Sequence, residues 1–135
     1  MHYTEDPFLI HFIKKEPSFY NPILNRGTWV RTYAIRKILS NFIKAYSPCQ
    51  IVSFGSGFDT NYFLMKALYP SNNFRYLELD FIDVVEKKKT IIAKTAGLSK
   101  LANYEQKQYS IVEADIRNIS SLEKAYKAFN LSYAY

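Results

Sequence analysis

A glycine-rich turn is the stretch of this sequence that is best suited to hold a ligand. Residues 51–54 read Ile-Val-Ser-Phe, and Gly55-Ser56-Gly57 and the polar pair Asp59-Thr60 follow. Glycine accepts a positive φ and leaves no Cβ between the backbone and a ligand. A helix after such a turn presents free N–H groups and a positive dipole end. The pattern predicts a strand, a tight turn and a helix start that together form a binding cradle.

Two acidic residues fall where a ligand at this turn would extend. Asp80 ends one predicted strand, over 74–80, and Asp115 directly follows another, over 109–114. In a parallel sheet, ligands bind beyond the carboxyl ends of the strands, so Gly55, Asp80 and Asp115 would share one rim of a pocket. Asp80 suits the two hydroxyls of a ribose. Asp115 is placed to accept from an adenine amino group, with the backbone N–H of Ile116 beside the ring, so we expect a nucleoside.

Two nucleoside cofactors compete at this site. Dinucleotide folds usually have Gly or Ala where this sequence has Thr60, which disfavours the pyrophosphate of NAD. S-adenosylmethionine instead needs an anchor for the carboxylate of its amino-acid end, and arginine pairs well with carboxylates. Arg26 and Arg31, upstream of the turn, are the candidates for that pairing.

Alternating strands and helices are expected to position these residues. An N-terminal stretch through residue 13 predicts a helix of about two turns, with Asp6 as its N-cap and Pro7 at its first position. Prolines at 17 and 22 predict a loop over residues 16–24. The later segments alternate between two periodicities, which favours a parallel sheet. We predict strands over 50–54, 74–80 and 109–114, and helices over 62–69, over 81–96 with Gly97 as its C-cap, and after a capping box formed by Ser120 and Glu123.

A long helix should precede the glycine turn, beginning near 25–28 and ending before Pro48. Its apolar residues recur at helical spacing and predict one buried face: Ile35, Leu39, Phe42, Ile43 and Tyr46. Arg36 and Lys37 are predicted on the opposite, solvated face. Arg26 and Arg31 then lie near the start of this helix.

Composition narrows the class of protein further. The chain has 135 residues, of which 48% are hydrophobic, and a formal net charge of +6. No apolar run approaches the roughly 20 residues of a membrane helix, and no secretory leader is visible. The lysines at 87–89 are interpreted as a solvated surface, and no nucleic-acid-binding module is recognisable. The single Cys49 favours a reducing compartment, and His2 and His11 lack partners at metal-ligand spacing, so we expect a cytoplasmic protein without a metal.

Several segments together resemble the leucine carboxyl methyltransferases. They follow in the same order along nearly the whole chain: Asp6-Pro7-Phe8, Asn25-Arg26-Gly27 with Arg31, Gly55-x-Gly57-x-Asp59-Thr60, Glu78-Leu79-Asp80-Phe81 and Ala114-Asp115-Ile116-Arg117. The resemblance implies a Rossmann-like class I methyltransferase fold, with 1–48 as an N-terminal helical segment. Residues 49–135 would form the first β-α-β-α-β-α half of the S-adenosylmethionine domain of a longer enzyme.

The resemblance also implies a role for individual residues. The expected contacts to S-adenosylmethionine are Arg31, Gly55, Gly57, Asp80, Asp115 and Ile116. Arg26 is the local candidate for receiving the acceptor carboxylate. The implied acceptor is the C-terminal leucine of the protein phosphatase 2A catalytic subunit, with no membrane or nucleic-acid partner. A carboxylate is already anionic at pH 7, so we nominate no catalytic acid or base.

Three alternatives remain open at the level of sequence. A related carboxyl methyltransferase acting on modified tRNA or on a small molecule would share these motifs. A dehydrogenase domain that binds NAD is disfavoured by Thr60, and a non-catalytic scaffold would keep the fold without the chemistry. A strand over 50–54 would be central in the whole sheet, so we expect this chain alone to have an exposed apolar edge and to be poorly stable or inactive.

Overall fold

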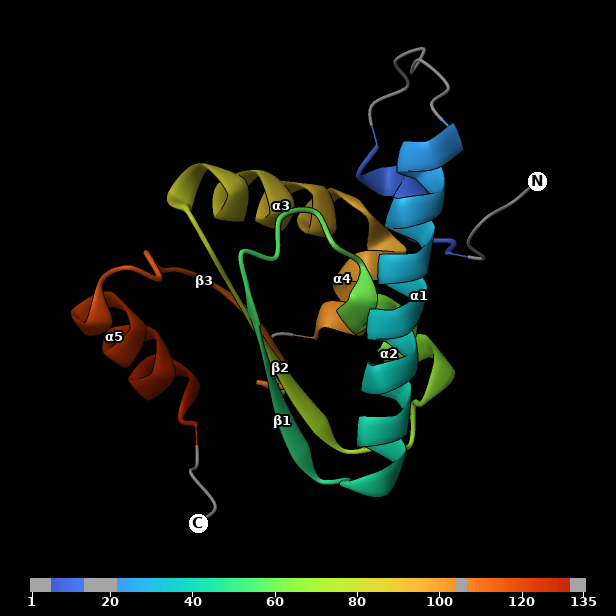
Figure 1. The fold of residues 1–135 in the computed structure, drawn as a ribbon. Coiled ribbons are helices and arrows are strands. Elements are labelled where there is room, and N and C mark those ends of the chain that lie inside the picture. The colour runs from blue at the N-terminus through green and yellow to red at the C-terminus, as the bar shows by residue number, and fades with distance from the viewer. Residues whose placement is uncertain (1–5, 14–21, 104–106, 132–135) are drawn as a thin grey trace.

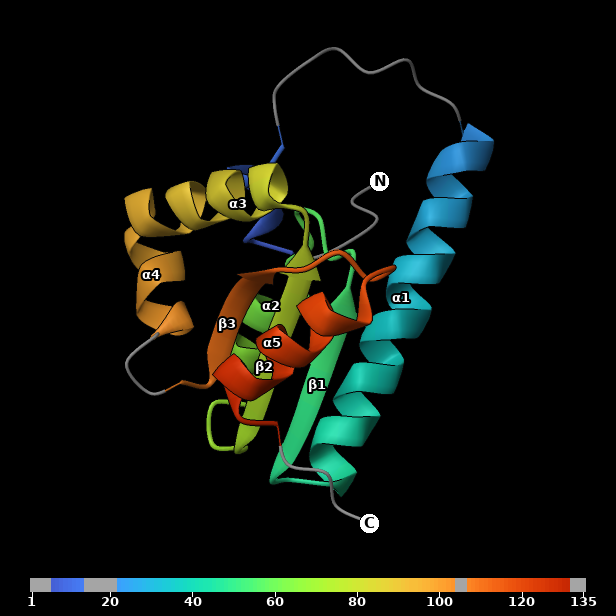
Figure 2. The same cartoon turned by 90° about the vertical axis from the view of Figure 1, so that its left-hand side faces the viewer.

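The computed structural model describes residues 6–13, 22–103 and 107–131 (Figure 1). These residues form a three-layered α/β arrangement in which helices cover both faces of a small sheet (Figure 2). In chain order the elements are the 3₁₀ turn η1 (Leu9–His11), α1 (Pro22–Ala45), β1 (Cys49–Phe54), α2 (Asn61–Leu68), β2 (Phe74–Asp80), α3 (Ile82–Lys94), α4 (Ala96–Ala102), β3 (Tyr109–Glu113) and α5 (Ile119–Phe129).

The three strands form one parallel sheet in the order β1-β2-β3. Ile51 on β1 lies opposite Tyr76 on β2, and Tyr76 lies opposite Tyr109 on β3. This register brings the carboxyl ends of the three strands to the same edge of the sheet. The predicted parallel α/β fold and its three strand positions are confirmed.

The two faces of β2 build two separate cores. Tyr76 faces the larger core, where α1, α2, α3 and α4 pack. Leu77 and Leu79 face the other core, which α5 covers with Ala125 and Phe129. In the larger core the rings of Tyr62 and Tyr109 stack with their centroids 4.1 Å apart. The alternation along β2 follows from the period of two in an extended strand.

The N-terminal predictions are corrected in two places. The predicted two-turn helix is only the three-residue turn η1, although the backbone N–H of Phe8 does donate to Asp6 Oδ1 at 3.0 Å. The long helix α1 begins at Pro22 rather than near 25–28, so the predicted loop over 16–24 ends earlier; residues 16–21 of that loop lie outside the described part. Proline is well tolerated in the first turn of a helix because its missing N–H has no partner there.

The predicted end of the helix after β2 is wrong. Helix α3 stops at Lys94 because Thr95 adopts an extended conformation, with φ −112° and ψ 105°. Gly97 is therefore not a C-cap but lies inside α4, which begins at Ala96. The structure thus has an additional short helix between the helix predicted over 81–96 and the strand predicted over 109–114.

The predicted capping box at Ser120 and Glu123 is also wrong. Asn118 is the N-cap of α5, and its Oδ1 accepts from the backbone N–H of Ser120 at 3.0 Å and of Ser121 at 3.4 Å. An asparagine at this position satisfies N–H groups that have no partner inside the helix.

We expect Asn118→Ala to lower the free energy of unfolding by about 1 kcal/mol, because it removes this cap. Urea denaturation followed by circular dichroism measures the change. Glu123→Ala is the matched control, and its effect should stay within about 0.5 kcal/mol since Glu123 is exposed. A larger loss in the Glu123 variant than in the Asn118 variant would restore the capping-box interpretation.

Helix α1 buries only part of its predicted apolar face. Ile43 is fully buried and Leu39 packs against the larger core, whereas Ile35, Phe42 and Tyr46 are 44%, 38% and 64% exposed. Strand β1 beside it is paired only with β2 among the described residues, and Phe54 at its end is 52% exposed. This side of the molecule is therefore an open apolar edge, as the sequence predicted.

Candidate functional site

The glycine turn joins β1 to α2 in a left-handed backbone conformation. Gly55 and Gly57 have φ values of +60° and +53°, which residues with a Cβ rarely adopt. Among the described residues, and apart from Gly55 itself and its two chain neighbours, no heavy atom lies within 4 Å of the position that a Cβ on Gly55 would occupy. The backbone N–H of Gly55 donates to the Leu79 carbonyl at 2.8 Å, which holds the turn against the end of β2. The turn therefore offers an open, bare backbone surface at the carboxyl edge of the sheet.

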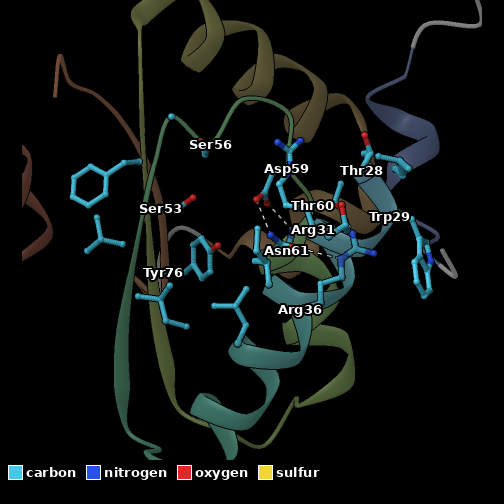
Figure 3. A pocket seen from close by; sticks show the side chains of 18 residues that line it. Thr28, Trp29, Arg31, Arg36, Ser53, Ser56, Asp59, Thr60, Asn61 and Tyr76 are labelled. Atoms are coloured by element: carbon cyan, nitrogen blue, oxygen red, sulfur yellow. Dashed lines mark hydrogen bonds between the residues drawn. The ribbon is translucent and has the colours of Figure 1, made fainter. Parts of the chain in front are cut away.

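A hollow of about 790 Å³ opens between α1 and the carboxyl end of β1. We call it the larger hollow. In Figure 3, Arg31 and Arg36 reach it from α1, Ser53 and Tyr76 line its sheet side, and Asp59 lies between them. Gly55 is also part of its lining. The structure thus brings together Arg31 and the glycine turn, two of the features that the sequence singled out.

A second hollow of about 230 Å³ lies on the other side of the same glycine. We call it the smaller hollow. Its lining combines the end of β2 with the segment after β3: Gly55, Leu79, Asp80, Phe81, Ala114, Ile116 and Arg117. Asp80 and Ile116, both predicted site residues, therefore lie in the same hollow, and Gly55 is the residue that the two hollows share.

Asp80 is tied to the glycine turn as well as facing the smaller hollow. Its Oδ2 accepts from the backbone N–H of Gly57 at 2.7 Å, and its Oδ1 accepts from that of Phe81 at 2.8 Å. A carboxylate has about four acceptor positions, so these two bonds leave capacity for ligand hydroxyls. Gly57 thus serves the site through Asp80, which its N–H orients.

Besides Gly57, which lines neither hollow, two predicted residues are placed less directly. Asp115 belongs to the segment after β3, but its carboxylate pairs with Arg117, at 2.7 Å from Nη2, and is not part of the lining of either hollow. This pairing holds the pKa of Asp115 at about 2. Arg26 is exposed on the first turns of α1 and also does not line either hollow.

The sequence missed a polar cluster beside the larger hollow. Arg36, predicted on the solvated face of α1, is instead half-buried and forms an ion pair with Asp6. Its Nε donates to Asn61 Oδ1 at 3.1 Å, and its Nη2 donates to Thr60 Oγ1 at 3.2 Å. The prediction failed because arginine is usually exposed, although Arg36 does fall at helical spacing from the partly buried Leu39 and the fully buried Ile43.

The sequence also missed a buried ion pair beneath the turn. Lys88, interpreted as part of a solvated lysine run, is fully buried on α3 and forms an ion pair with Glu78, which is fully buried on β2. Its Nζ also donates to the backbone carbonyl of Asp59 at 2.7 Å. Burial raises the pKa of Glu78, and the charge of Lys88 opposes that rise. The available signal was spacing, because Lys88 lies three residues after Val85 and four before Ile92, which are both buried.

The described residues contain no group of three or more His, Cys, Asp or Glu side chains that could hold a metal ion. Within the same ranges, no helix is long and apolar enough to cross a membrane. Cys49 is free, and partial burial raises the pKa of its thiol.

Comparison with known proteins assigns this chain to a family. The family model for leucine carboxyl methyltransferase matches residues 2–131. "Leucine carboxyl methyltransferase 1" of Schizosaccharomyces pombe is 36% identical over 104 residues, covering 76% of this chain and 34% of that protein. The protein of that name from Bos taurus is 29% identical, covering 96% of this chain and 43% of its own length.

A differently named relative also matches. "tRNA wybutosine-synthesizing protein 4" of Aspergillus fumigatus is 27% identical over 143 residues, covering 94% of this chain and 14% of that protein. The chain thus spans about a third to two-fifths of the first relatives named above and a smaller share of this one. Since the family model covers nearly all of it, the chain belongs to the leucine carboxyl methyltransferase family.

Proposed function

We propose that this chain supplies the first half of an S-adenosylmethionine site in a carboxyl methyltransferase. One observation carries the proposal: two hollows meet at Gly55, with Arg31 lining one and Asp80 lining the other. S-adenosylmethionine is an amino acid joined to a nucleoside, so its two chemically different ends would occupy the two hollows. Residues 1–48 would be the N-terminal helical segment, and 49–135 the first half of the Rossmann-like domain.

The smaller hollow suits an adenosine group. Asp80 would accept hydrogen bonds from the ribose hydroxyls, and the apolar lining from Leu79, Phe81 and Ile116 suits a flat purine. Asp115 and the backbone of Ile116 would meet the polar edge of the ring, which requires Asp115 to exchange part of its contact with Arg117.

The larger hollow suits the amino-acid end of the cofactor. Arg31 would pair with the carboxylate, for which a guanidinium offers two parallel donors. The open space next to Gly55 admits a ligand close to the backbone, and a side chain at that position would fill it. Arg31 and Gly55 therefore keep the contacts proposed for them, whereas Gly57 would act through its hydrogen bond to Asp80.

The proposed reaction esterifies the C-terminal leucine carboxylate of the protein phosphatase 2A catalytic subunit. The family to which the chain belongs supports a leucine carboxylate as the acceptor. When bound, S-adenosylmethionine supplies an activated methyl group on sulfur. The protein needs no general base, because the acceptor oxygen is already anionic; its task is to align the oxygen and exclude water. Arg26 remains the proposed contact for the acceptor carboxylate.

A second acceptor is supported by one finding. The relative from Aspergillus fumigatus carries a name in tRNA wybutosine synthesis, so methylation of a carboxylate on modified tRNA remains the alternative. A small-molecule acceptor, or a scaffold without chemistry, would be left if neither macromolecule reacts. In all of these cases we place the protein in the cytoplasm.

The test uses the complete natural protein that contains this chain. We expect calorimetric titration to detect binding of S-adenosylmethionine and none of NAD. Transfer of a labelled methyl group to a peptide with a free C-terminal leucine, and not to the same peptide as its amide, should follow. Binding of NAD alone would overturn the proposed cofactor. Transfer to tRNA but not to the peptide would overturn the proposed acceptor.

A further inference from the structure

Asp59 presents a carboxylate to the larger hollow and has not yet been given a role. It is half-buried, and its Oδ1 accepts from the backbone N–H of Asn61 at 2.8 Å. Its Oδ2 accepts from the side-chain amide of the same residue at 2.7 Å. Both donors are neutral, so these bonds orient the carboxylate without cancelling its charge.

The charged side chains around Asp59 form ion pairs with one another, so their charges balance. Arg36 forms an ion pair with Asp6, and Lys88 forms one with Glu78. In the described ranges, no lysine or arginine forms an ion pair with Asp59 itself, and its negative charge is therefore the surplus charge of this cluster. Burial raises the pKa of Asp59, and the more distant charges of Lys88 and Arg36 oppose that rise. A surplus half-buried anion that lines a hollow is suited to bind a cation.

The position of Asp59 is fixed from two sides. From below, Lys88 Nζ donates to its backbone carbonyl at 2.7 Å. From the side of α1, Arg36 Nε donates to Asn61 Oδ1, and Asn61 in turn holds the Asp59 carboxylate (Figure 3). Elements α1 and α3 thus determine where this carboxylate lies, as a preorganised binding group requires.

We propose that Asp59 binds the ammonium group of the amino-acid end of S-adenosylmethionine. This inference rests on the cofactor proposed above and adds a residue to the same site. An α-amino acid carries one cation and one anion, and the larger hollow is lined by one guanidinium, Arg31, placed for the anion, and one surplus carboxylate, Asp59, placed for the cation. The hollow therefore selects an amino acid in its zwitterionic form.

Three ligands and one variant, Asp59→Asn, test the assignment by calorimetry in the complete protein. S-adenosylhomocysteine has the ammonium and no sulfonium, its deaminated analogue lacks the ammonium, and methylthioadenosine lacks the amino-acid end. We expect the variant to bind S-adenosylhomocysteine about 10- to 100-fold more weakly, because a charge-assisted hydrogen bond is lost. It should bind the other two as the unchanged protein does.

Two controls separate this inference from the cofactor proposal. Asp80→Asn should weaken all three ligands, since each contains the ribose. Asp83→Asn changes an exposed carboxylate on α3 and should weaken none. If the unchanged protein binds none of the three, the cofactor proposal fails. If it binds them and Asp59→Asn leaves all affinities equal, only the role of Asp59 fails.

Two further outcomes also decide the matter. If Asp59→Asn weakens the binding of S-adenosylmethionine but not that of S-adenosylhomocysteine, Asp59 contacts the sulfonium, and the ammonium role is overturned. If Asp59→Asn does not fold, the unchanged protein still gives an answer. It should bind the deaminated analogue about 10- to 100-fold more weakly than S-adenosylhomocysteine, and equal affinities would overturn the inference.

Discussion

Replacing Lys88 by Met should lower the free energy of unfolding by about 3–5 kcal/mol, which is the cost of removing one partner from a buried ion pair. Lys88 and Glu78 are both fully buried and paired, so the variant leaves a carboxylate without a counter-charge inside the larger core. Chemical denaturation followed by circular dichroism measures the loss. Lys87→Met, at the exposed neighbouring position, is the matched control and should change stability by less than about 0.5 kcal/mol.

The double variant Lys88→Met with Glu78→Leu separates stability from positioning. Apolar residues often replace a buried ion pair without a net loss, so most of the lost stability should return. The Asp59 carbonyl still loses the ammonium that holds it, so affinity for S-adenosylhomocysteine should stay reduced. Recovery of both properties would show that the pair serves stability alone.

The loss in Lys88→Met should depend on pH. Burial raises the pKa of Glu78 above its usual 4.5, and removing Lys88 removes the charge that opposes this rise. A carboxyl group with a raised pKa in the folded state binds its proton more tightly there than in the unfolded chain. In the unchanged protein the pKa of Glu78 is already about 7, so both proteins lose stability alike as the pH rises from 4.5 to that value. The pKa of Glu78 is higher still in the variant, so the extra loss in Lys88→Met should grow as the pH rises above about 7. A loss that is constant with pH would contradict this assignment.

Replacing Arg31 by Ala should raise the dissociation constant for S-adenosylmethionine by about 10- to 100-fold, because a hydrogen-bonded charge pair is lost. Arg31 is exposed on α1, so its removal should leave the free energy of unfolding within about 0.5 kcal/mol. Calorimetric titration and thermal denaturation of the same samples measure the two quantities.

Two comparisons make the Arg31 result specific. Lys37→Ala removes an exposed cation from the same helix outside the lining of the hollow, and it should bind the cofactor normally. Methylthioadenosine, which has no carboxylate, should bind the Arg31 variant as tightly as the unchanged protein. An equal loss for both ligands would mean that Arg31 acts through the fold and not through the carboxylate.

The sheet and the rim of the site were predictable because their signals are local. Strand β2 was predicted with its observed bounds, since aromatic residues and leucines are concentrated between Phe74 and Asp80. Gly55 and Gly57 indicated a turn with positive φ values, which the structure has. Parallel pairing then brings Gly55 and Asp80 to one edge, so the shared lining of the smaller hollow follows from topology.

The charged residues that support the site were not predictable by the same means. Arg36 and Lys88 lie at core positions of their helices, but residue type outweighed spacing in their interpretation. Their burial depends on ion pairs with Asp6 and Glu78, which lie on other segments of the chain and come close to Arg36 and Lys88 only in the folded state. The predictions of helix ends failed for a different reason. The start of α5 is set by hydrogen bonds to the Asn118 side chain, and the end of α3 is set by the extended backbone conformation of Thr95.

The register of the sheet has a consequence for how the site is assembled over time. Cys49 pairs with Phe74 and Tyr76 with Tyr109, so each strand pairing joins segments separated by at least one helix. Such non-local pairings form slowly, because the intervening chain loses conformational entropy when it closes into a loop, before the contacts between the strands stabilise it. Both hollows lie where these pairings end, so they exist only in the completed sheet. A cofactor that binds there binds only the folded state, and it therefore shifts the folding equilibrium toward that state by mass action.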